Sequence, residues 1–165
     1  MAKIRNPLPL TVNWSKEHKR EYYLDHQVKK NQWKIGVEVG VRFGRTLFHL
    51  LDNNPSLKMY AVDKDISQFY SEKIQKKYGD RLVVLEGESW DQVAHITELV
   101  DFVFIDAGHS TKSAAKDINA YRGILKSPYG LTGHDVDFPA IQEALRICKV
   151  EFDVCPDNVW HQKIT

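Results

Sequence analysis

The 165-residue sequence predicts an α/β protein with a doubly wound, mainly parallel sheet. Short apolar runs alternate with stretches of helical periodicity from residue 34 to the end of the chain. Several of these runs are followed directly by glycine or by an acidic residue, as at the ends of strands that border a ligand site. Strand and helix alternating at this spacing require right-handed crossovers, which place the strands parallel to one another.

Seven apolar runs predict the strands, and the run over 100–105 is the most apolar of them. We expect strands over residues 34–39, 58–62, 81–85, 100–105, 130–132, 152–154 and 159–161. We expect helices between them over residues 45–51, 66–78, 89–99, 111–125 and 139–148. Gly79 stops the second of these helices, Ser89 caps the third, and Pro139 stands at the start of the last, where its missing N–H costs nothing.

Residues 1–34 form a basic helical segment ahead of a domain over residues 35–165. The segment carries eight Lys or Arg residues against three acidic ones, whereas the remainder carries 15 against 19. Ser15 is a predicted cap for an amphipathic helix that includes Tyr22, Leu24 and Val28. Its basic residues are expected to face water or to meet an anionic substrate.

Composition limits the classes of function. The net charge of +1 provides no strong field for nucleic acid, and no apolar run is long enough to span a bilayer. Charged residues at the start have no apolar core behind them, so we expect no secretory signal and a cytoplasmic protein. Cys148 and Cys155 are expected to be free thiols.

The first strand ends in a glycine-containing loop with the pattern E-x-G-x-x-x-G-x-T. Its members are Glu38, Gly40, Gly44 and Thr46, with Phe43 between the glycines. Neither the dinucleotide fingerprint nor a Walker loop is present, so the loop does not resemble a pyrophosphate site. A carboxylate at the strand end suits a cationic ligand better than a phosphate.

The next two strands also end in residues typical of a ligand site. Asp63 and Lys64 follow the second strand, about 20 residues beyond the glycines, where an acid can accept the hydroxyls of a ribose. Glu88 and Ser89 follow the third strand, beside the expected position of an adenine, and Trp90 can stack on or shield it. Three such strand ends in one register predict a nucleoside-containing ligand.

Two further motifs give the chain a resemblance to class I S-adenosylmethionine-dependent methyltransferases. The fourth strand ends in Phe-Ile-Asp-Ala-Gly-His-Ser over 104–110, and the fifth ends in Gly-His-Asp over 133–135. The resemblance covers residues 35–165 and implies a Rossmann-like sheet of seven strands whose last strand is antiparallel. A Pro-Gly-Gly turn that is usual before the fifth strand is replaced by Ser-Pro-Tyr-Gly over 127–130. The resemblance implies that the cofactor S-adenosylmethionine is bound by Glu38, Gly40, Phe43, Gly44, Thr46, Asp63, Lys64, Glu88, Ser89 and Asp106.

The ends of the fourth and fifth strands supply the candidate catalytic residues. Asp106, His134 and Asp135 are candidate ligands for Mg²⁺ or another divalent cation, although the imidazole of His134 suits transition metals better than Mg²⁺. His109 is the candidate general base, because its unperturbed pKa is near neutral. A histidine that only orients Asp106 is the alternative interpretation of His109.

These observations favour an enzyme that methylates a small molecule, with a hydroxyl oxygen as the acceptor and possible assistance from a metal. A cofactor-binding module without turnover is one alternative, and methylation of a nitrogen on a macromolecule is another. A metal-dependent hydrolase is a weaker alternative, because it leaves Glu38 and Asp63 unexplained. Homo-oligomers that pair through the basic segment are compatible with the sequence.

Overall fold

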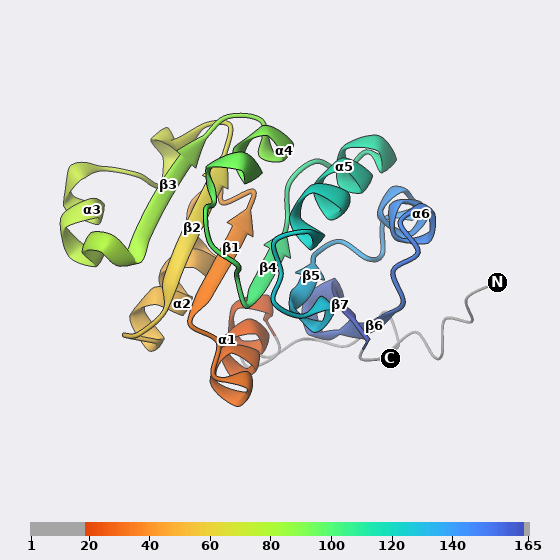
Figure 1. The fold of residues 1–165 in the computed structure, drawn as a ribbon, viewed down its shortest axis with the longest axis horizontal. Helices are drawn as coiled ribbons and strands as arrows, with labels where there is room; N and C mark the ends of the chain where they lie inside the picture. Colours follow the sequence, from red (N-terminus) through yellow and green to blue (C-terminus); the bar gives the residue numbers. More distant parts are fainter. Residues whose placement is uncertain (1–18, 164–165) are drawn as a thin grey trace.

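A computed structural model describes residues 19–163, so the predicted cap Ser15 lies outside the described residues. A seven-stranded sheet runs through the molecule in the order β3-β2-β1-β4-β5-β7-β6 (Figure 1). Its strands are β1 (Ile35–Val39), β2 (Lys58–Asp63), β3 (Leu82–Glu86), β4 (Phe102–Ile105), β5 (Leu131–Gly133), β6 (Phe152–Cys155) and β7 (Val159–Gln162).

The first five strands are parallel, and β7 pairs antiparallel with both β5 and β6. The predicted Rossmann-like sheet with an antiparallel last strand is therefore confirmed. Strand order reverses between β1 and β4, since the chain passes outward from β1 to β3 and then returns to the other side of β1. In sheets of this kind, ligands bind at that point, outside the carboxyl ends of the strands.

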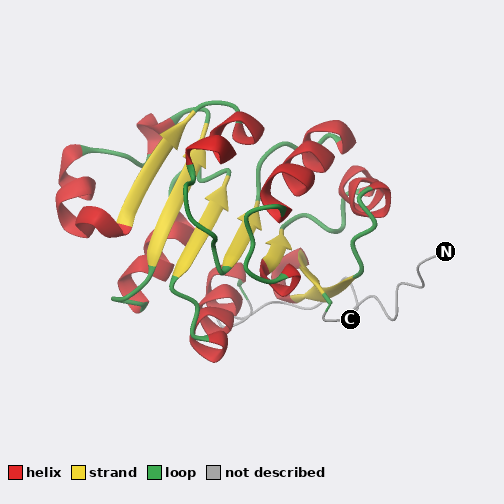
Figure 2. Ribbon diagram, in the orientation of Figure 1, coloured by secondary structure: helices red, strands yellow, loops and turns green. Residues whose placement is uncertain are grey.

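Helices alternate with the strands, as Figure 2 shows. They are α1 (Arg20–Asn31), α2 (Arg45–Asn53), α3 (Glu72–Tyr78), α4 (Ser89–Gln92), α5 (Thr111–Arg122) and α6 (Pro139–Ile147). Within the described residues, every helix is too short or too polar to cross a membrane.

Two of the predicted helices are wrong in extent. The stretch 66–78 divides into a short 3₁₀ turn (Ile66–Gln68) and α3, and the stretch 89–99 is helical only to His95. In the first case, Asp65 accepts a hydrogen bond from the backbone of Ser67, and Ser71 accepts one from Ile74. These short polar side chains offer the backbone local partners and interrupt a continuous helix.

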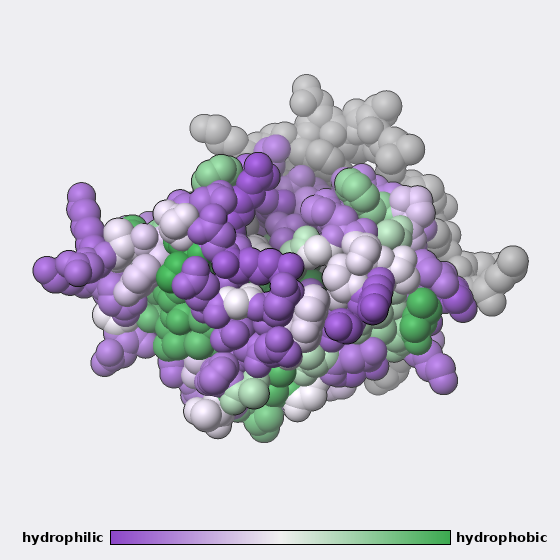
Figure 3. All heavy atoms as spheres, turned by 90° about the horizontal axis from the view of Figure 1, so that it is seen from above, coloured by the Kyte–Doolittle hydropathy of each residue, from purple (hydrophilic) through white to green (hydrophobic). Residues whose placement is uncertain are grey.

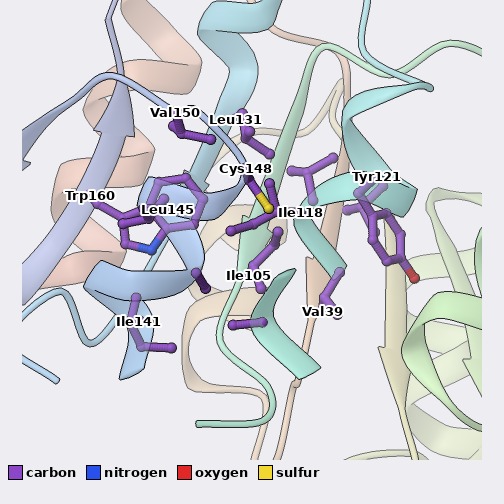
Figure 4. Packing of buried hydrophobic residues seen from close by; sticks show 14 of the residues in the cluster. Val39, Ile105, Ile118, Tyr121, Leu131, Ile141, Leu145, Cys148, Val150 and Trp160 are labelled. Carbon is purple, nitrogen blue, oxygen red and sulfur yellow. The ribbon is translucent and has the colours of Figure 1, made fainter. Parts of the chain in front are cut away.

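Each face of the sheet is covered by its own hydrophobic cluster. Side chains alternate along the strands, so Val103 and Ile105 of β4 point to one face while Phe102 and Phe104 point to the other. The first cluster packs under α5 and α6, where Ile118, Leu145 and Trp160 are fully or almost fully buried (Figure 4).

Helix α1 belongs to the second cluster. Its Leu24 and Val28 are one helical turn apart and are buried together with leucines of α2. On α2, the residues Leu47, Leu50 and Leu51 share the face that meets the sheet, which is the spacing of an amphipathic helix. The basic segment predicted at the start of the chain thus contributes a helix to the core. Figure 3 views the molecule from the side where β1 to β5 end, and this face is mostly hydrophilic.

Candidate functional site

The loop between β1 and α2 makes the closest approach to the neighbouring strand. Gly40 has a φ of +86°, and a Cβ atom there would lie 2.2 Å from the carbonyl oxygen of Asp106. Only glycine allows both this conformation and this contact. Gly44 also has a positive φ, of +76°, and forms the N-cap of α2. The glycines of the predicted motif therefore fix the path of the loop across the end of β4.

Asp63 at the end of β2 holds the same loop. Its Oδ2 atom accepts hydrogen bonds from the backbone N–H groups of Val41, at 2.7 Å, and Arg42, at 2.8 Å. Arg42 has a φ of +54°, in the left-handed region that non-glycine residues rarely adopt. The carboxylate predicted to bind ribose hydroxyls thus also stabilises an unfavourable turn.

A first cavity of about 520 Å³ opens between the ends of β1, β2 and β3 and helix α5. It brings together most of the residues predicted around an adenosine. Its wall includes Gly40, Asp63, Lys64, Ser89, Trp90, Asp106, His109 and Asp117.

A second cavity of about 560 Å³ lies on the other side of the glycine loop. Phe43 and Phe138 present largely exposed rings along it, and the Phe138 ring stacks on His109 with centroids 5.4 Å apart. Its wall also includes Arg20, Glu38, Gly40, Arg42, Arg45, Thr46, Asp106, His134 and Asp135.

The two cavities share one stretch of wall, made by Gly40, Arg42, Asp106, Ala107 and His109. A ligand in the first cavity and a ligand in the second would therefore meet beside Asp106 and His109. That arrangement suits the transfer of a group between two bound molecules, because it brings their reacting atoms together.

The predicted catalytic residues form one cluster at this wall. His109 Nε2 lies 2.6 Å from Asp135 Oδ2, and His134 Nδ1 lies 2.8 Å from Asp135 Oδ1 and 3.5 Å from Asp106 Oδ1. Asp106, His134 and Asp135 each offer one ligand atom within 4.8 Å of the others. The sequence therefore identified three side chains that are close enough to hold a cation together.

Arg20 joins this cluster from α1 and was not predicted. Its Nη1 atom lies 3.3 Å from Asp106 Oδ2, and 3.1 and 3.3 Å from the two ring nitrogens of His134. Burial is the largest single effect on the pKa of His134 and lowers it, but the hydrogen bond to Asp106 and the charges of Asp106 and Asp135 together outweigh it, and the pKa is raised. A guanidinium thus lies against two of the three candidate metal ligands.

Glu38 lies below this wall and is 3% exposed. Burial, together with the nearby charge of Asp106, raises its pKa well above the ordinary value. Its Oε2 atom is buried and has no hydrogen-bond partner within residues 19–163. A cationic or hydrogen-bond-donating ligand group in the second cavity would satisfy this oxygen.

Asp117 of α5 is the second residue that the sequence analysis missed. It is 1% exposed, its Oδ1 accepts a hydrogen bond from Ser89 Oγ, and burial raises its pKa to about 6. The signal was present in the sequence, because Asp117 falls on the helix face occupied by Ala114, Ile118 and Tyr121. An acid on an otherwise apolar face indicates a special role.

Two predicted cofactor residues do not line either cavity. Gly44 acts through the backbone turn alone, and Glu88 forms an ion pair with Lys64, with 2.9 Å between Oε1 and Nζ. Ser89, the neighbour of Glu88, lines the first cavity instead. Cys148 and Cys155 are free thiols, as predicted.

Comparison with known proteins adds a family and a set of solved structures. A family model described as a methyltransferase domain matches residues 37–136. No curated protein matches the sequence.

Among solved structures, an O-methyltransferase from Bacillus cereus in complex with S-adenosylhomocysteine aligns over 92% of this chain and 83% of its own, with a TM-score of 0.68 and 16% identity. A methyltransferase from Podospora anserina with bound S-adenosylhomocysteine aligns over 88% and 77%, with a TM-score of 0.68 and 16% identity. A TDP-rhamnose 3′-O-methyltransferase of calicheamicin biosynthesis aligns over 96% and 88%, with a TM-score of 0.64 and 15% identity.

Proposed function

Because this chain belongs to the methyltransferase-domain family, we propose that it transfers the methyl group of S-adenosylmethionine to a hydroxyl oxygen of a small molecule. The observation that carries the proposal is the pair of cavities that meet at Asp106 and His109. We assign the nucleoside end of the methyl donor to the first cavity and the acceptor to the second, and the methyl group would be transferred at the shared wall. The O-methyltransferase of Bacillus cereus, which has a similar fold, supports the choice of donor.

The charges around the first cavity support a cationic nucleoside as the ligand. Asp63 accepts a ribose hydroxyl at Oδ1 with the capacity left free by its contacts from the backbone N–H groups of Val41, Arg42 and Asp65. Glu38 lines the second cavity, so the methionine moiety extends past the shared wall, where its amino group donates a hydrogen bond to the unpartnered Oε2 of Glu38. In both contacts the carboxylate accepts the hydrogen bond and the ligand donates it, because an ionised carboxylate has no proton to donate.

Methyl transfer needs alignment and a deprotonated nucleophile. The acceptor oxygen attacks the methyl carbon, the carbon–sulfur bond breaks, and S-adenosylhomocysteine leaves as a neutral thioether. His109 takes the hydroxyl proton. When its Nε2 donates to Asp135, its Nδ1 is left as the basic nitrogen, and the carboxylate stabilises the imidazolium that forms.

Asp106, His134 and Asp135 fit a divalent cation. Their donors are two carboxylates and an imidazole from neighbouring strand ends, within 4.8 Å of one another. A bound cation would lower the pKa of an acceptor hydroxyl. Arg20 lies against the same donors and has to move for a cation to bind.

Calorimetric titration of S-adenosylmethionine into the metal-stripped protein, repeated with Mg²⁺, tests the cofactor and the metal together. We expect binding in the micromolar range, with a change in affinity when Mg²⁺ is present. Absence of binding in both conditions would refute the proposed cofactor. Identical binding in both conditions would support the proposed cofactor and refute a metal that shares its site.

We expect Asp106→Ala to abolish methyl transfer, because this residue borders both ligands and the cation site. Turnover is measured as S-adenosylhomocysteine released with a panel of hydroxyl and amine acceptors. Asp153→Ala is the control, since its exposed side chain lies on β6 away from both cavities. Full turnover by Asp106→Ala would refute the site. Cofactor binding without turnover on any acceptor would favour a non-catalytic module.

A further inference from the structure

Asp117 places a carboxyl group in the wall of the first cavity, in a buried position where an ionised group is energetically unfavourable. Its side chain comes from the second turn of α5 and is 1% exposed. Its Oδ1 atom accepts the hydroxyl of Ser89, and its Oδ2 atom is buried without a hydrogen-bond partner among residues 19–163. A buried oxygen that is left without a partner costs free energy unless a ligand supplies the missing donor.

The packing of α5 does not explain an acid at this position. The neighbours on the same helix face, Ala114, Ile118 and Tyr121, all pack into the first hydrophobic cluster, where Ile118 and Tyr121 are seen in Figure 4. An apolar residue at position 117 would suit that cluster better. Ser89 is held independently, because its carbonyl accepts a hydrogen bond of 2.6 Å from the Tyr121 hydroxyl. Asp117 is therefore not needed to hold Ser89 in place.

The cavity that Asp117 lines is the one assigned above to the adenosine of the methyl donor, and the inference rests on that proposed function. A carboxylate can only accept hydrogen bonds. An adenosine offers two kinds of donor, the ribose hydroxyls and the exocyclic amino group of the base. Asp63 at the end of β2 meets the hydroxyls, so the amino group is the donor that remains for Asp117.

We propose that Asp117 selects the purine base of the cofactor by accepting a hydrogen bond from the exocyclic amino group of adenine at its free Oδ2 atom. Hypoxanthine carries a carbonyl oxygen at that position. Its lone pairs would face those of the carboxylate, and neither group could donate to the other. A site built to bond to one group rejects the analogue that lacks it.

Glu88 is the competing residue, because it follows β3 beside the same cavity and was predicted to flank the adenine. Its Oε1 atom pairs with Lys64, which offsets its charge, while its Oε2 atom, like Oδ2 of Asp117, is buried without a hydrogen-bond partner among residues 19–163. Asp117 lines the first cavity and Glu88 does not, so only the free oxygen of Asp117 belongs to a residue that faces a ligand there. The base is read from helix α5 and not from the end of β3.

The test compares S-adenosylhomocysteine with S-inosylhomocysteine by calorimetry in the wild type, Asp117→Asn and Glu88→Gln. We expect the wild type to bind the adenosine ligand about tenfold or more tightly, the loss that follows from one missing bond to a charged acceptor. In Asp117→Asn, the amide oxygen keeps the Ser89 bond while the amide nitrogen stands in place of Oδ2 and donates to the hypoxanthine carbonyl. We expect the preference to disappear or to reverse. Glu88→Gln keeps the wild-type ratio.

The ratio of two affinities within one protein is insensitive to partial loss of folded material. A wild-type ratio below about threefold would overturn the proposal without any variant. So would a tenfold preference that persists in Asp117→Asn, or one that is lost in Glu88→Gln. If the wild type binds neither ligand, the proposed function itself fails, and this outcome is distinct from an unchanged ratio.

Discussion

A buried carboxyl group with a hydrogen bond to only one of its oxygens contributes less to the stability of a folded protein at neutral pH, where it is ionised, than in acid, where it is protonated. The pKa of Asp117 rises from an ordinary 3.8 to about 6 because of burial. The folded protein therefore holds its proton more tightly than the unfolded chain does. Its contribution to stability is present below pH 4 and is lost as the pH rises through 6.

We accordingly expect Asp117→Asn to stabilise the ligand-free protein at pH 7.5. A shift of about two pKa units corresponds to about 3 kcal/mol in the free energy of unfolding, which is the upper bound of the gain. Urea unfolding at pH 7.5 and pH 4 measures it, and the gain should vanish at pH 4. Asp153→Asn, whose side chain is 69% exposed, is the matched control. Equal stabilities of wild type and Asp117→Asn at pH 7.5 would contradict the expectation.

Arg20 places a positive charge at the proposed cation site. Its guanidinium lies 3.3 Å from Asp106 and 3.1 Å from His134 Nδ1. We expect Arg20→Gln to bind Mn²⁺ about tenfold more tightly than the wild type, because one repelling charge a few ångströms away is removed. Electron paramagnetic resonance of free Mn²⁺ measures the affinity without substrate.

Arg45→Gln controls for the general loss of a charge. Arg45 also lines the second cavity, but its Nη2 is bonded to Glu21 Oε2 at 2.9 Å. Its replacement should leave the Mn²⁺ affinity within about twofold of the wild type, since Glu21 already offsets the charge of this half-exposed side chain. Arg20→Gln that binds Mn²⁺ no better than Arg45→Gln would show that Arg20 does not oppose the metal.

At the scale of single residues, the sequence located the residues of the candidate site that lie at strand ends. Asp63, Asp106 and Asp135 follow apolar runs, and parallel strands bring their carboxyl ends together. Arg20 could not be predicted in the same way. It stands among eight basic residues in a segment whose tertiary position no local pattern defines. Asp117 could have been found from its position on the apolar face of α5.

At the scale of elements, α1 is attached to the sheet by its own apolar residues. Leu24 has no exposed surface and packs with the leucines of α2. We expect Leu24→Ala to lower the free energy of unfolding by about 2–5 kcal/mol, since a cavity replaces the side chain. Lys30→Ala, at an exposed position of the same helix, is the control. Urea unfolding that is unchanged by Leu24→Ala would show that α1 is not part of the cooperative core.

The predicted and observed elements differ where polar side chains compete with the backbone. Strands were predicted to within about two residues, because burial on both faces produces continuous apolar runs. The helix expected over 66–78 fails at Ser71, whose hydroxyl caps α3 by accepting from Ile74. The helical spacing of apolar residues continues through such a break, so the spacing alone does not reveal where the helix is interrupted.

At the scale of the whole molecule, both hydrophobic clusters share the strands of one sheet. We therefore expect a single thermal transition that shifts as a unit when a cofactor product binds. S-adenosylhomocysteine at 100 times its dissociation constant should add about 2.7 kcal/mol and raise the melting temperature by about 5–10 °C. Scanning calorimetry with and without the ligand measures the shift, with adenosine triphosphate as the control nucleotide. A second transition whose midpoint temperature is unchanged by the ligand would contradict the expectation.

The two cavities draw on different stretches of the polypeptide. Every residue named in the first lies between Gly40 and Asp117, whereas the second borrows Arg20 from one end of the chain and His134 to Phe138 from the other. With the proposed assignment of donor and acceptor to the two cavities, substitutions in these outer stretches would alter the surroundings of the acceptor and leave the first cavity unchanged. Acceptor specificity can therefore change during evolution, or in a library of variants at Phe43 and Phe138, while the residues that line the first cavity stay the same.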